Sequence, residues 1–503
     1  MKRLKILIPL LVMMMVWLSG CSENSATTTA ETTAEAVTET TAVLSAIVSP
    51  TSTIVVDPEF TDRDLETSYD DATAVAVTLD GSTIQVTGDG ASASDGVLTI
   101  TKEGIYVVSG NLTDGQIVVA AADTDKIQIV LNGATINCTD NAPIYVKSAN
   151  KVFVTLNANT VNTLTDGGAY VQTDDNTVDG VIFSKADLTI NGEGTLNITA
   201  NYKDAIVSKD DLVITSGTYN ITAANHGLNA KDAVKIKDGV INITAANGKA
   251  ITSQNDEDTI KGYVYIAGGT INIASSNEGI EGTAIVVEGG TIDLVSKDDG
   301  FNAASPGAAE TESGGRGAGM QADTNAYLSI AGGTISVDAS GDGLDSNGNV
   351  YISGGTVEVS GPTNSGNGAL DYNGTADVSG GTVVIAGSTG MAQSFSETST
   401  QASLLYNLTS SCAAGTEVKL TDASGKTIVS YTPDKTYQSV VISSPDLVQG
   451  STYTLTCGSQ TVEIPLTGII TSNGQSGMGG PGQGGQGQPQ GGQSPPQGGQ
   501  KPQ

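Results

Sequence analysis

Two stretches decide the fold: Gly269-Thr270-Ile271-Asn272-Ile273 and Gly290-Thr291-Ile292-Asp293-Leu294. The same phrase, a Gly followed by Thr, apolar, polar and apolar residues, returns about every 22 residues, with longer intervals where loops are inserted. Further copies or near copies begin at Gly194, Gly217, Gly239, Gly333, Gly355 and Gly381. Because the aliphatic side chains alternate at a period of two, each copy predicts a strand with one buried face.

Two more short strands are expected in each repeat. An alternating pair such as Val264 and Ile266 precedes each phrase, and a short apolar segment such as Gly279-Ile280-Glu281 opens the repeat. The helical half and the Leu spacing of leucine-rich repeats are absent from this pattern. The sequence therefore predicts an all-β protein, a parallel β-helix with three short strands in each coil of about 22 residues.

The regular repeats divide the chain into segments. Residues 51–128 are less regular, and we expect them to form an N-terminal cap with the first strands. Residues 129–395 form the predicted β-helix, and residues 396–472, with their changed strand spacing and intervening prolines, predict a small C-terminal antiparallel β domain. Residues 473–503 are mostly Gly, Gln and Pro, which predicts a disordered tail.

The N-terminus has the layout of a secretory signal. Residues 1–20 place basic residues before an apolar run that is shorter than the roughly 20 residues of a membrane-spanning helix. Leu18-Ser19-Gly20-Cys21 resembles the lipobox of bacterial lipoproteins, which implies that Cys21 carries a lipid. With residues 21–50 as a Thr-rich tether, we expect an extracellular protein that is anchored to the cell membrane through this lipid.

The charge balance narrows the possible partners. Asp and Glu outnumber Lys and Arg by 54 to 22, and the formal net charge is -32. Nucleic acid is excluded as a partner, because its phosphates are neutralised by Lys and Arg. The acidity indicates multivalent cations as counterions, or, as an alternative, only a solubilising acidic surface.

Reactive residue types are scarce. His226 is the single histidine, so multi-histidine metal sites and most catalytic triads are excluded, and Trp17 is the single tryptophan. The sequence has no Cys-x-x-Cys pair for zinc or redox chemistry. Cys412 and Cys457 lie in one small segment and could form a disulfide, whereas Cys138 would remain a buried thiol.

Oxygen-bearing side chains recur where the repeats open. When the opening strands are aligned, two neighbouring columns become acidic from residue 278 onward. Two carboxylates stacked about 5 Å apart repel by roughly 3 kcal/mol at an effective dielectric of 20. A calcium ion between them would make the interaction attractive. The expected calcium ligands are Glu278, Glu281, Asp298, Asp299, Asn302, Asp342, Asp345 and Asp371. The alternative is that they are turn residues that bind their own backbone.

The same motifs resemble a known family. Glu278-Gly279-Ile280-Glu281, Asp298–Ala303, Gly341–Gly348 and Pro433–Pro445 are similar to segments of bacterial surface carbohydrate-binding lipoproteins, and the resemblance extends from Val56 to Ile470. It implies a right-handed parallel β-helix with bound calcium that binds acidic plant polysaccharide such as polygalacturonate. The fold would be distantly similar to that of pectate and other polysaccharide lyases.

Three functions fit these features. The first is binding of an acidic polysaccharide by a monomeric protein through calcium, with Lys231, Lys249, Lys297 and Arg316 as basic contacts to the glycan. The second is a calcium-dependent lyase in which Lys249 acts as the base of a β-elimination. The third is a structural stalk that binds no glycan. The binding protein is the favoured interpretation, and it has no catalytic residues.

Overall fold

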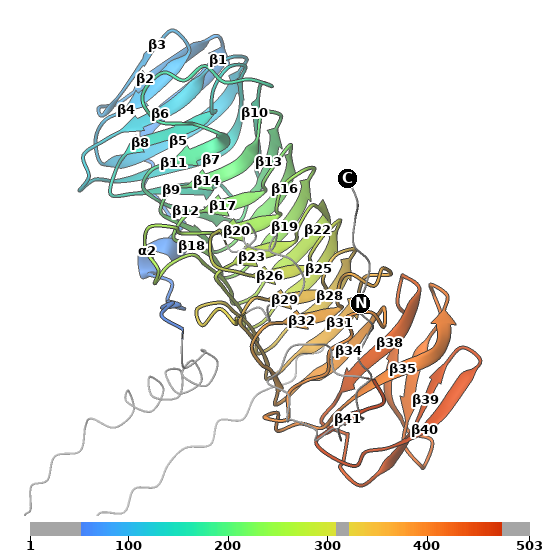
Figure 1. Cartoon of the computed structure of the whole chain (residues 1–503). Helices are drawn as coiled ribbons and strands as arrows, with labels where there is room; N and C mark the ends of the chain where they lie inside the picture. The colour runs from blue at the N-terminus through green and yellow to red at the C-terminus, as the bar shows by residue number, and fades with distance from the viewer. Residues whose placement is uncertain (1–51, 308–320, 475–503) are drawn as a thin grey trace, which may run out of the picture. The chain divides into compact units, whose positions relative to one another are not determined.

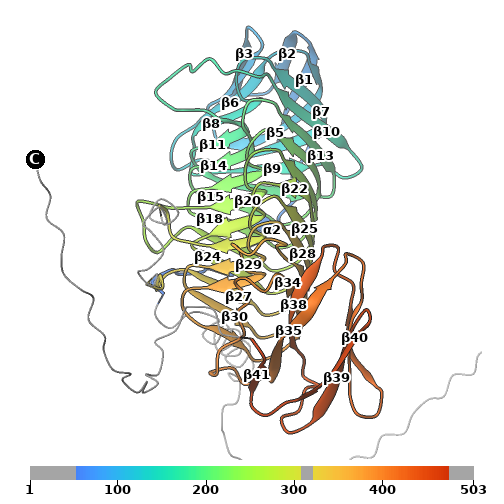
Figure 2. The same cartoon turned by 45° about the vertical axis from the view of Figure 1, so that its right-hand side comes forward.

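The computed structural model describes residues 52–307 and 321–474, and these are almost entirely β-strand (Figure 1). The predicted all-β class is confirmed. In these ranges the single helix is the four-residue α2 (Asp62–Leu65). Most strands pair in parallel with the strand three places further along the chain, so each repeat gives one strand to each of three ladders (Figure 2).

The first ladder, here called the opening ladder, is a twelve-stranded sheet formed by the short strands that open the repeats. Its strands are β3 (Ala91–Ser94), β4 (Val97–Ile100), β6 (Gln116–Ala120), β8 (Ile144–Ser148), β11 (Gly180–Ser184), β14 (Asp204–Ser208), β17 (Leu228–Ala230), β20 (Ile251–Ser253), β23 (Ile280–Gly282), β26 (Phe301–Ala303), β29 (Leu344–Ser346) and β32 (Leu370–Tyr372). All its pairs are parallel except β3 with β4.

The second or middle ladder belongs to a 25-stranded sheet. Its strands are β5 (Gly104–Leu112), β7 (Lys126–Cys138), β9 (Lys151–Leu156), β12 (Asp187–Gly192), β15 (Asp211–Ile214), β18 (Ala233–Ile236), β21 (Tyr263–Ile266), β24 (Ala284–Val287), β27 (Tyr327–Ile330), β30 (Asn349–Ile352) and β33 (Ala376–Val378). The long strand β7 also pairs with the third ladder and so joins the two.

The third or closing ladder contains the Gly-Thr phrases. Its strands are β10 (Val161–Asp166), β13 (Thr195–Ala200), β16 (Thr218–Ala223), β19 (Val240–Ala245), β22 (Thr270–Ser276), β25 (Thr291–Ser296), β28 (Thr334–Ala339), β31 (Thr356–Ser360) and β34 (Thr382–Gly387). Equivalent residues of successive phrases are paired, as Ile273 is with Leu294 and Leu294 with Val337. These side chains are at most 1% exposed, and burial of each contributes about 1.5–3 kcal/mol.

Antiparallel pairs stand at both ends of the repeats. At the leading end β2 (Thr83–Thr87) runs antiparallel to β1 (Val75–Gly81), which continues the middle ladder beside β5. At the far end β38 (Tyr437–Ser443) runs antiparallel to both β34 and β35 (Ser403–Cys412), and β41 (Ile470–Ser472) lies beside β35. A separate antiparallel sheet follows, with β37 (Thr427–Tyr431), β36 (Val418–Thr421), β39 (Thr452–Cys457) and β40 (Gln460–Pro465).

Cys412 and Cys457 are neighbours in this C-terminal part. Both are buried free thiols, and Cys412 Sγ lies 3.5 Å from the carbonyl oxygen of Cys457. Burial raises the pKa of the Cys457 thiol to about 11, so this thiol is protonated at neutral pH. Cys138 is also a buried free thiol, as expected.

Residues 52–66 form a strap across the middle ladder. Ile54 and Val56 pack against Tyr263, Tyr265 and other side chains of β21, β24 and β27. The Val55 N–H donates to the carbonyl of Ile260 at 3.0 Å. The strap ends in α2, whose capping box is formed by Thr61 and Asp64. The strap thereby ties the start of the described chain to strands β21, β24 and β27, which lie some two hundred residues further along.

Several predicted features lie outside the described residues: the signal, the Cys21 anchor, the tether, Arg316 and residues 475–503. Within the described ranges no helix has the length and apolar character needed to cross a membrane.

Candidate functional site

The residues at the start of the opening strands, or just before them, form what we call the edge column. They are Asp204, His226, Lys249, Glu278, Asp299 and Asp342, and the carbonyl of each later member accepts a hydrogen bond from the repeat before it. For example, the Gly279 N–H donates to the Asp299 carbonyl at 2.9 Å, and the Gly300 N–H donates to that of Asp342 at 2.8 Å. The alignment of repeats expected from the sequence is therefore the one in the structure.

A second column lies three positions further along. The strand register pairs Thr252 with Glu281, Glu281 with Asn302, Asn302 with Asp345, and Asp345 with Asp371. Side chains of both columns are thus brought together in successive repeats. The two columns contain every predicted calcium ligand except Asp298, which directly precedes Asp299.

Three carboxylates converge at the far end of these columns. Asp299, Asp342 and Asp345 each have one oxygen within 4.8 Å of the others. The Asp299 carboxylate also accepts the Asp342 N–H at 2.6 Å, and the Asp342 carboxylate accepts the Gly368 N–H. Burial raises the pKa of Asp299 to about 8, and the nearby Asp342 carboxylate acts in the same direction. This group, called the triple-Asp group below, is suited to holding a cation.

The negative charges of the neighbouring Glu278 and Glu281 are balanced by a lysine. Lys249 Nζ forms an ion pair with Glu281 and lies 3.8 Å from Glu278 Oε2. Asn302 Nδ2 donates to the same Glu278 oxygen at 3.2 Å, and Gln254 Nε2 donates to Glu281 at 3.1 Å. Burial raises the pKa of Glu278, and the charge of Lys249 opposes that shift. The predicted ligand set therefore divides into a glutamate pair served by a lysine and the triple-Asp group.

The other predicted residues have partners within the protein. Lys231 pairs with Glu257 at 2.5 Å, and Lys297 Nζ donates to the Ala246 carbonyl at 2.6 Å. Asp371 accepts hydrogen bonds from Gln393 Nε2 and from the Tyr372 N–H.

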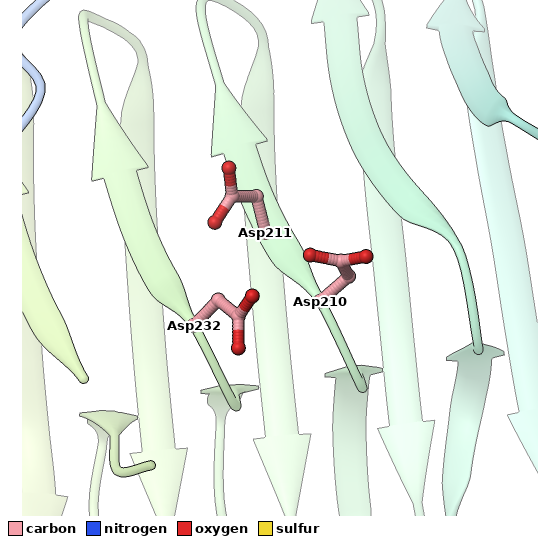
Figure 3. A group of neighbouring side chains, drawn as sticks. All are labelled: Asp210, Asp211 and Asp232. Carbon is pink, nitrogen blue, oxygen red and sulfur yellow. The ribbon is translucent and has the colours of Figure 1, made fainter. Parts of the chain in front are cut away.

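A second acidic group was not expected from the sequence. Figure 3 shows the carboxylates of Asp210, Asp211 and Asp232 close together, and one oxygen of each lies within 4.8 Å of the others. Lys261 pairs with Asp232, whose Oδ1 also accepts Asn255 Nδ2 at 2.6 Å. Burial raises the pKa of Asp210 to about 7 and that of Asp211 to about 6, and the Asp187 carboxylate adds to both shifts.

A signal for this group does exist in the sequence. Ser208-Lys209-Asp210 and Ala230-Lys231-Asp232 place a Lys-Asp step at the same turn of two successive repeats. The register of β15 with β18 pairs Asp211 with Ala233, which sets Asp210 beside Asp232. Aligning the turns that follow the opening strands, as well as those that precede them, would have revealed it.

Comparisons with known proteins relate the chain to carbohydrate-binding domain proteins. Residues 94–368 match the family described as "Carbohydrate-binding domain-containing protein". A protein of the same description from Acetivibrio thermocellus is 41% identical over 195 residues, which are 38% of this chain and 68% of that protein. The solved structure titled "Structure of the polysaccharide lyase-like protein from C. thermocellum, Gadolinium derivative" is 32% identical, covers 54% of this chain and 96% of its own, and has a TM-score of 0.41. Since the family match spans more than half of the sequence, the chain belongs to the carbohydrate-binding domain family.

Proposed function

We propose that this protein binds an acidic polysaccharide such as polygalacturonate through calcium held at the triple-Asp group. Family membership supports carbohydrate as the ligand. The convergence of Asp299, Asp342 and Asp345 carries the proposal, because one oxygen of each lies within 4.8 Å of the others. Such a set of carboxylate oxygens is what a divalent cation such as calcium binds.

The donors around the triple-Asp group fit calcium. This ion takes about six to eight oxygen ligands from carboxylates, amides, backbone and water. The buried Oδ1 of Asn302 accepts no hydrogen bond among the described residues, and Asn302 is paired in register with Asp345. An amide oxygen without a partner, on the strand next to Asp345, supports a further ligand near the triple-Asp group.

Calcium would also explain how an acidic protein attracts an acidic glycan. The formal charge of -32 repels a polyuronate, whereas an ion that is only partly enclosed by protein oxygens retains positions for uronate carboxylates. Lys231, Lys249, Lys297 and Arg316 remain the proposed basic contacts to the glycan.

Calorimetric titration with polygalacturonate tests this proposal. Binding is expected in calcium and at least tenfold weaker in EDTA, and Asp342→Asn is expected to remove the calcium-dependent part. Asp123→Asn makes the same change of charge at an exposed position and should bind as the wild type does. Equal affinity with and without calcium would refute the role of the ion, and no affinity in either would leave the stalk as the function.

The lyase alternative is tested in the same samples. Lys249, its candidate base, is occupied by ion pairs with Glu281 and Glu278, which favours a charge-balancing role. Accumulation of unsaturated uronide, followed by absorbance and lost in Lys249→Ala, would establish catalysis.

Three further features are proposed as well. The three ladders are proposed to wind as a right-handed parallel β-helix, in a monomer. Cys21 is proposed to carry the lipid that anchors the protein to the outer side of the cell membrane. Metabolic labelling with a fatty acid should mark the wild type and leave Cys21→Ser unlabelled.

A further inference from the structure

An open hollow of about 440 Å³ lies at the leading end of the edge column. This volume falls within the roughly 300–1,000 Å³ typical of small-ligand pockets. Its lining includes Tyr202, Lys203, Asn225, His226, Asn229 and Asn247. None of these residues belongs to the triple-Asp group or to the glutamate pair.

Asp204 organises the floor of the hollow. Its side chain is buried, and its carboxylate accepts Asn225 Nδ2 at 2.8 Å, the His226 N–H at 3.0 Å and Asn229 Nδ2 at 2.9 Å. The charge of Asp204 is therefore satisfied by the protein. The two asparagines are held in place by their amide nitrogens, and their Oδ1 atoms accept no hydrogen bond in the part of the chain that the structure describes.

His226 contributes a donor with a fixed tautomer. Its Nδ1 accepts the Lys249 N–H at 2.9 Å, so in the neutral ring the proton is on Nε2. Burial lowers the pKa of His226, although the Asp204 carboxylate opposes that shift, and the ring is neutral at pH 7. Nε2 donates to no residue within the described ranges and is therefore available to a ligand.

One wall of the hollow is aromatic and carries a positive charge. Tyr202 stacks on Tyr170 with ring centroids 4.5 Å apart and an interplanar angle of 21°. Lys203 Nζ lies 5.4 Å from the Tyr202 centroid and forms no salt bridge among residues 52–307 and 321–474. Asp179, the other acid of the lining, has Lys209 Nζ at 3.9 Å. The buried Oδ1 of Asp179 accepts no hydrogen bond among the described residues, and its charge is offset by the nearby charges of Lys209 and Lys203. With Asp204 hydrogen-bonded and lysines beside Asp179, the hollow does not require a cation to receive a ligand.

A sugar ring matches this set of groups. Its hydroxyls need both donors and acceptors, which His226 Nε2 and the asparagine oxygens provide, and its C–H face packs on an aromatic ring such as Tyr202. We infer that the hollow is a metal-independent subsite for one pyranose unit of the polysaccharide. This inference rests on the proposed function, because it assigns a second contact for the same glycan along the edge column.

The spacing along the edge column allows one glycan chain to reach both the hollow and the triple-Asp group. Lys249 and Glu278 stand between His226 and Asp299, so the two ends are three strand spacings apart, roughly 14 Å at about 4.8 Å per step. An extended chain that lies along the column would contact the hollow at one end and calcium at the other.

The single histidine makes the hollow directly observable. In the full chain, produced without a histidine tag and labelled with ¹⁵N-histidine, His226 gives the only imidazole signals. In EDTA, an oligogalacturonide and a cello-oligosaccharide are titrated separately, and at least one is expected to shift the Nε2 resonance in a saturable way. A shift with the uronide alone identifies Lys203 as the contact to its carboxylate, whereas shifts with both identify hydroxyl recognition.

Matched variants complete the test. Tyr202→Ala is expected to weaken the titrated affinity at least tenfold and Asn247→Ala several-fold, whereas Tyr69→Ala, a partly exposed tyrosine elsewhere, should leave it unchanged. The ligand-free His226 signal reports whether each variant retains its local fold. No shift with either sugar in EDTA overturns the inference, even if calcium-dependent binding of polygalacturonate is intact. A shift that is lost in Tyr202→Ala supports it, even if calcium proves irrelevant.

Discussion

Replacing Asp64 by Asn should release the strap from the middle ladder. Asp64 is only 3% exposed, and its Oδ1 lies 2.8 Å from Lys151 Nζ and 2.5 Å from Thr189 Oγ1. Its Oδ2 accepts the backbone N–H of Thr61 at 3.0 Å and the Thr61 hydroxyl at 2.6 Å. Asn keeps the shape of the side chain but removes the charge and turns one acceptor into a donor.

The size of the effect follows from these contacts. Removing one partner of a buried ion pair costs about 3–5 kcal/mol, and the lower end applies because the Lys151 side chain is 15% exposed. A loss of about 3 kcal/mol corresponds to a change of roughly a hundredfold in an equilibrium constant. The strap, which is otherwise held mainly by side-chain hydrogen bonds such as Arg63 with Gln128 and Lys235 with Asp57, should open locally while the ladders beneath it stay paired.

Hydrogen–deuterium exchange of the peptide that contains Val55 measures this opening. Its N–H is protected by the Ile260 carbonyl in the closed strap, and we expect its exchange to accelerate roughly a hundredfold in Asp64→Asn. Asp62→Asn removes the same charge in the same helical turn, at an exposed position, and should change exchange by less than threefold. Exchange in Asp64→Asn within threefold of the wild type would refute the reasoning.

The same contact predicts a pH dependence. Burial acts to raise the pKa of Asp64, but the bonds from Lys151, Thr189 and Thr61 outweigh it and hold the pKa below its ordinary value. A group whose pKa is lowered by folding stabilises the folded state at any pH above its ordinary pKa, which is near 3.8 for Asp. This stabilisation by Asp64 is lost as the pH falls through the folded-state pKa. The difference between wild type and Asp64→Asn should therefore shrink below about pH 4.

Two further predictions concern the repeats. Gly300→Ala should lower stability by about 1–3 kcal/mol, because the new Cβ would lie 2.5 Å from the Gly343 carbonyl oxygen, whereas Gly168→Ala, with nothing within 4 Å, should be nearly neutral in thermal unfolding. Asp210→Asn should stabilise the protein by about 1–2 kcal/mol at pH 8 and not at pH 4. In the wild type the pKa of Asp210 is raised to about 7, so its neutral side chain costs no stability below about pH 4, whereas the ionised carboxylate destabilises the folded state once the pH rises through 7. Urea unfolding at both pH values checks this, and an equal effect at both would contradict it.

The repeats could be predicted because their physics is local. A phrase such as Gly290-Thr291-Ile292 combines a turn and an alternating strand, and Gly290 has a φ of 92° that favours glycine. Once such phrases are aligned, parallel stacking places Asp299 beside Asp342 without further knowledge. The edge column was accordingly readable from the spacing of the repeats alone.

The strap and the hollow could not be read in this way. Ile54 and Asp64 belong to no repeat. Ile54 packs against Tyr263, and Asp64 accepts a hydrogen bond from Thr189, which is 125 residues further along, so no period predicts these contacts. In the hollow, the contact of Tyr202 with Tyr170 depends on how an inserted loop returns to the stack. The members of the triple-Asp group could be predicted from the sequence because the stacking of the repeats brings them together. The ion pair of Lys249 with Glu281 could not, because it depends on the conformations of the two side chains.

The antiparallel strands at the two ends bear on the protein's solubility. A stack of parallel strands in register exposes unpaired N–H and C=O groups at its last strand, and such an edge can recruit the equivalent strand of another molecule. Because β38 is antiparallel to β34, and β2 is antiparallel to β1, the last strand of the closing ladder and the first strand of the middle ladder are each covered by a strand that does not belong to the repeat. Direct pairing of these two ladders between the ends of two copies is thereby disfavoured, although the repeat itself is suited to fibre growth.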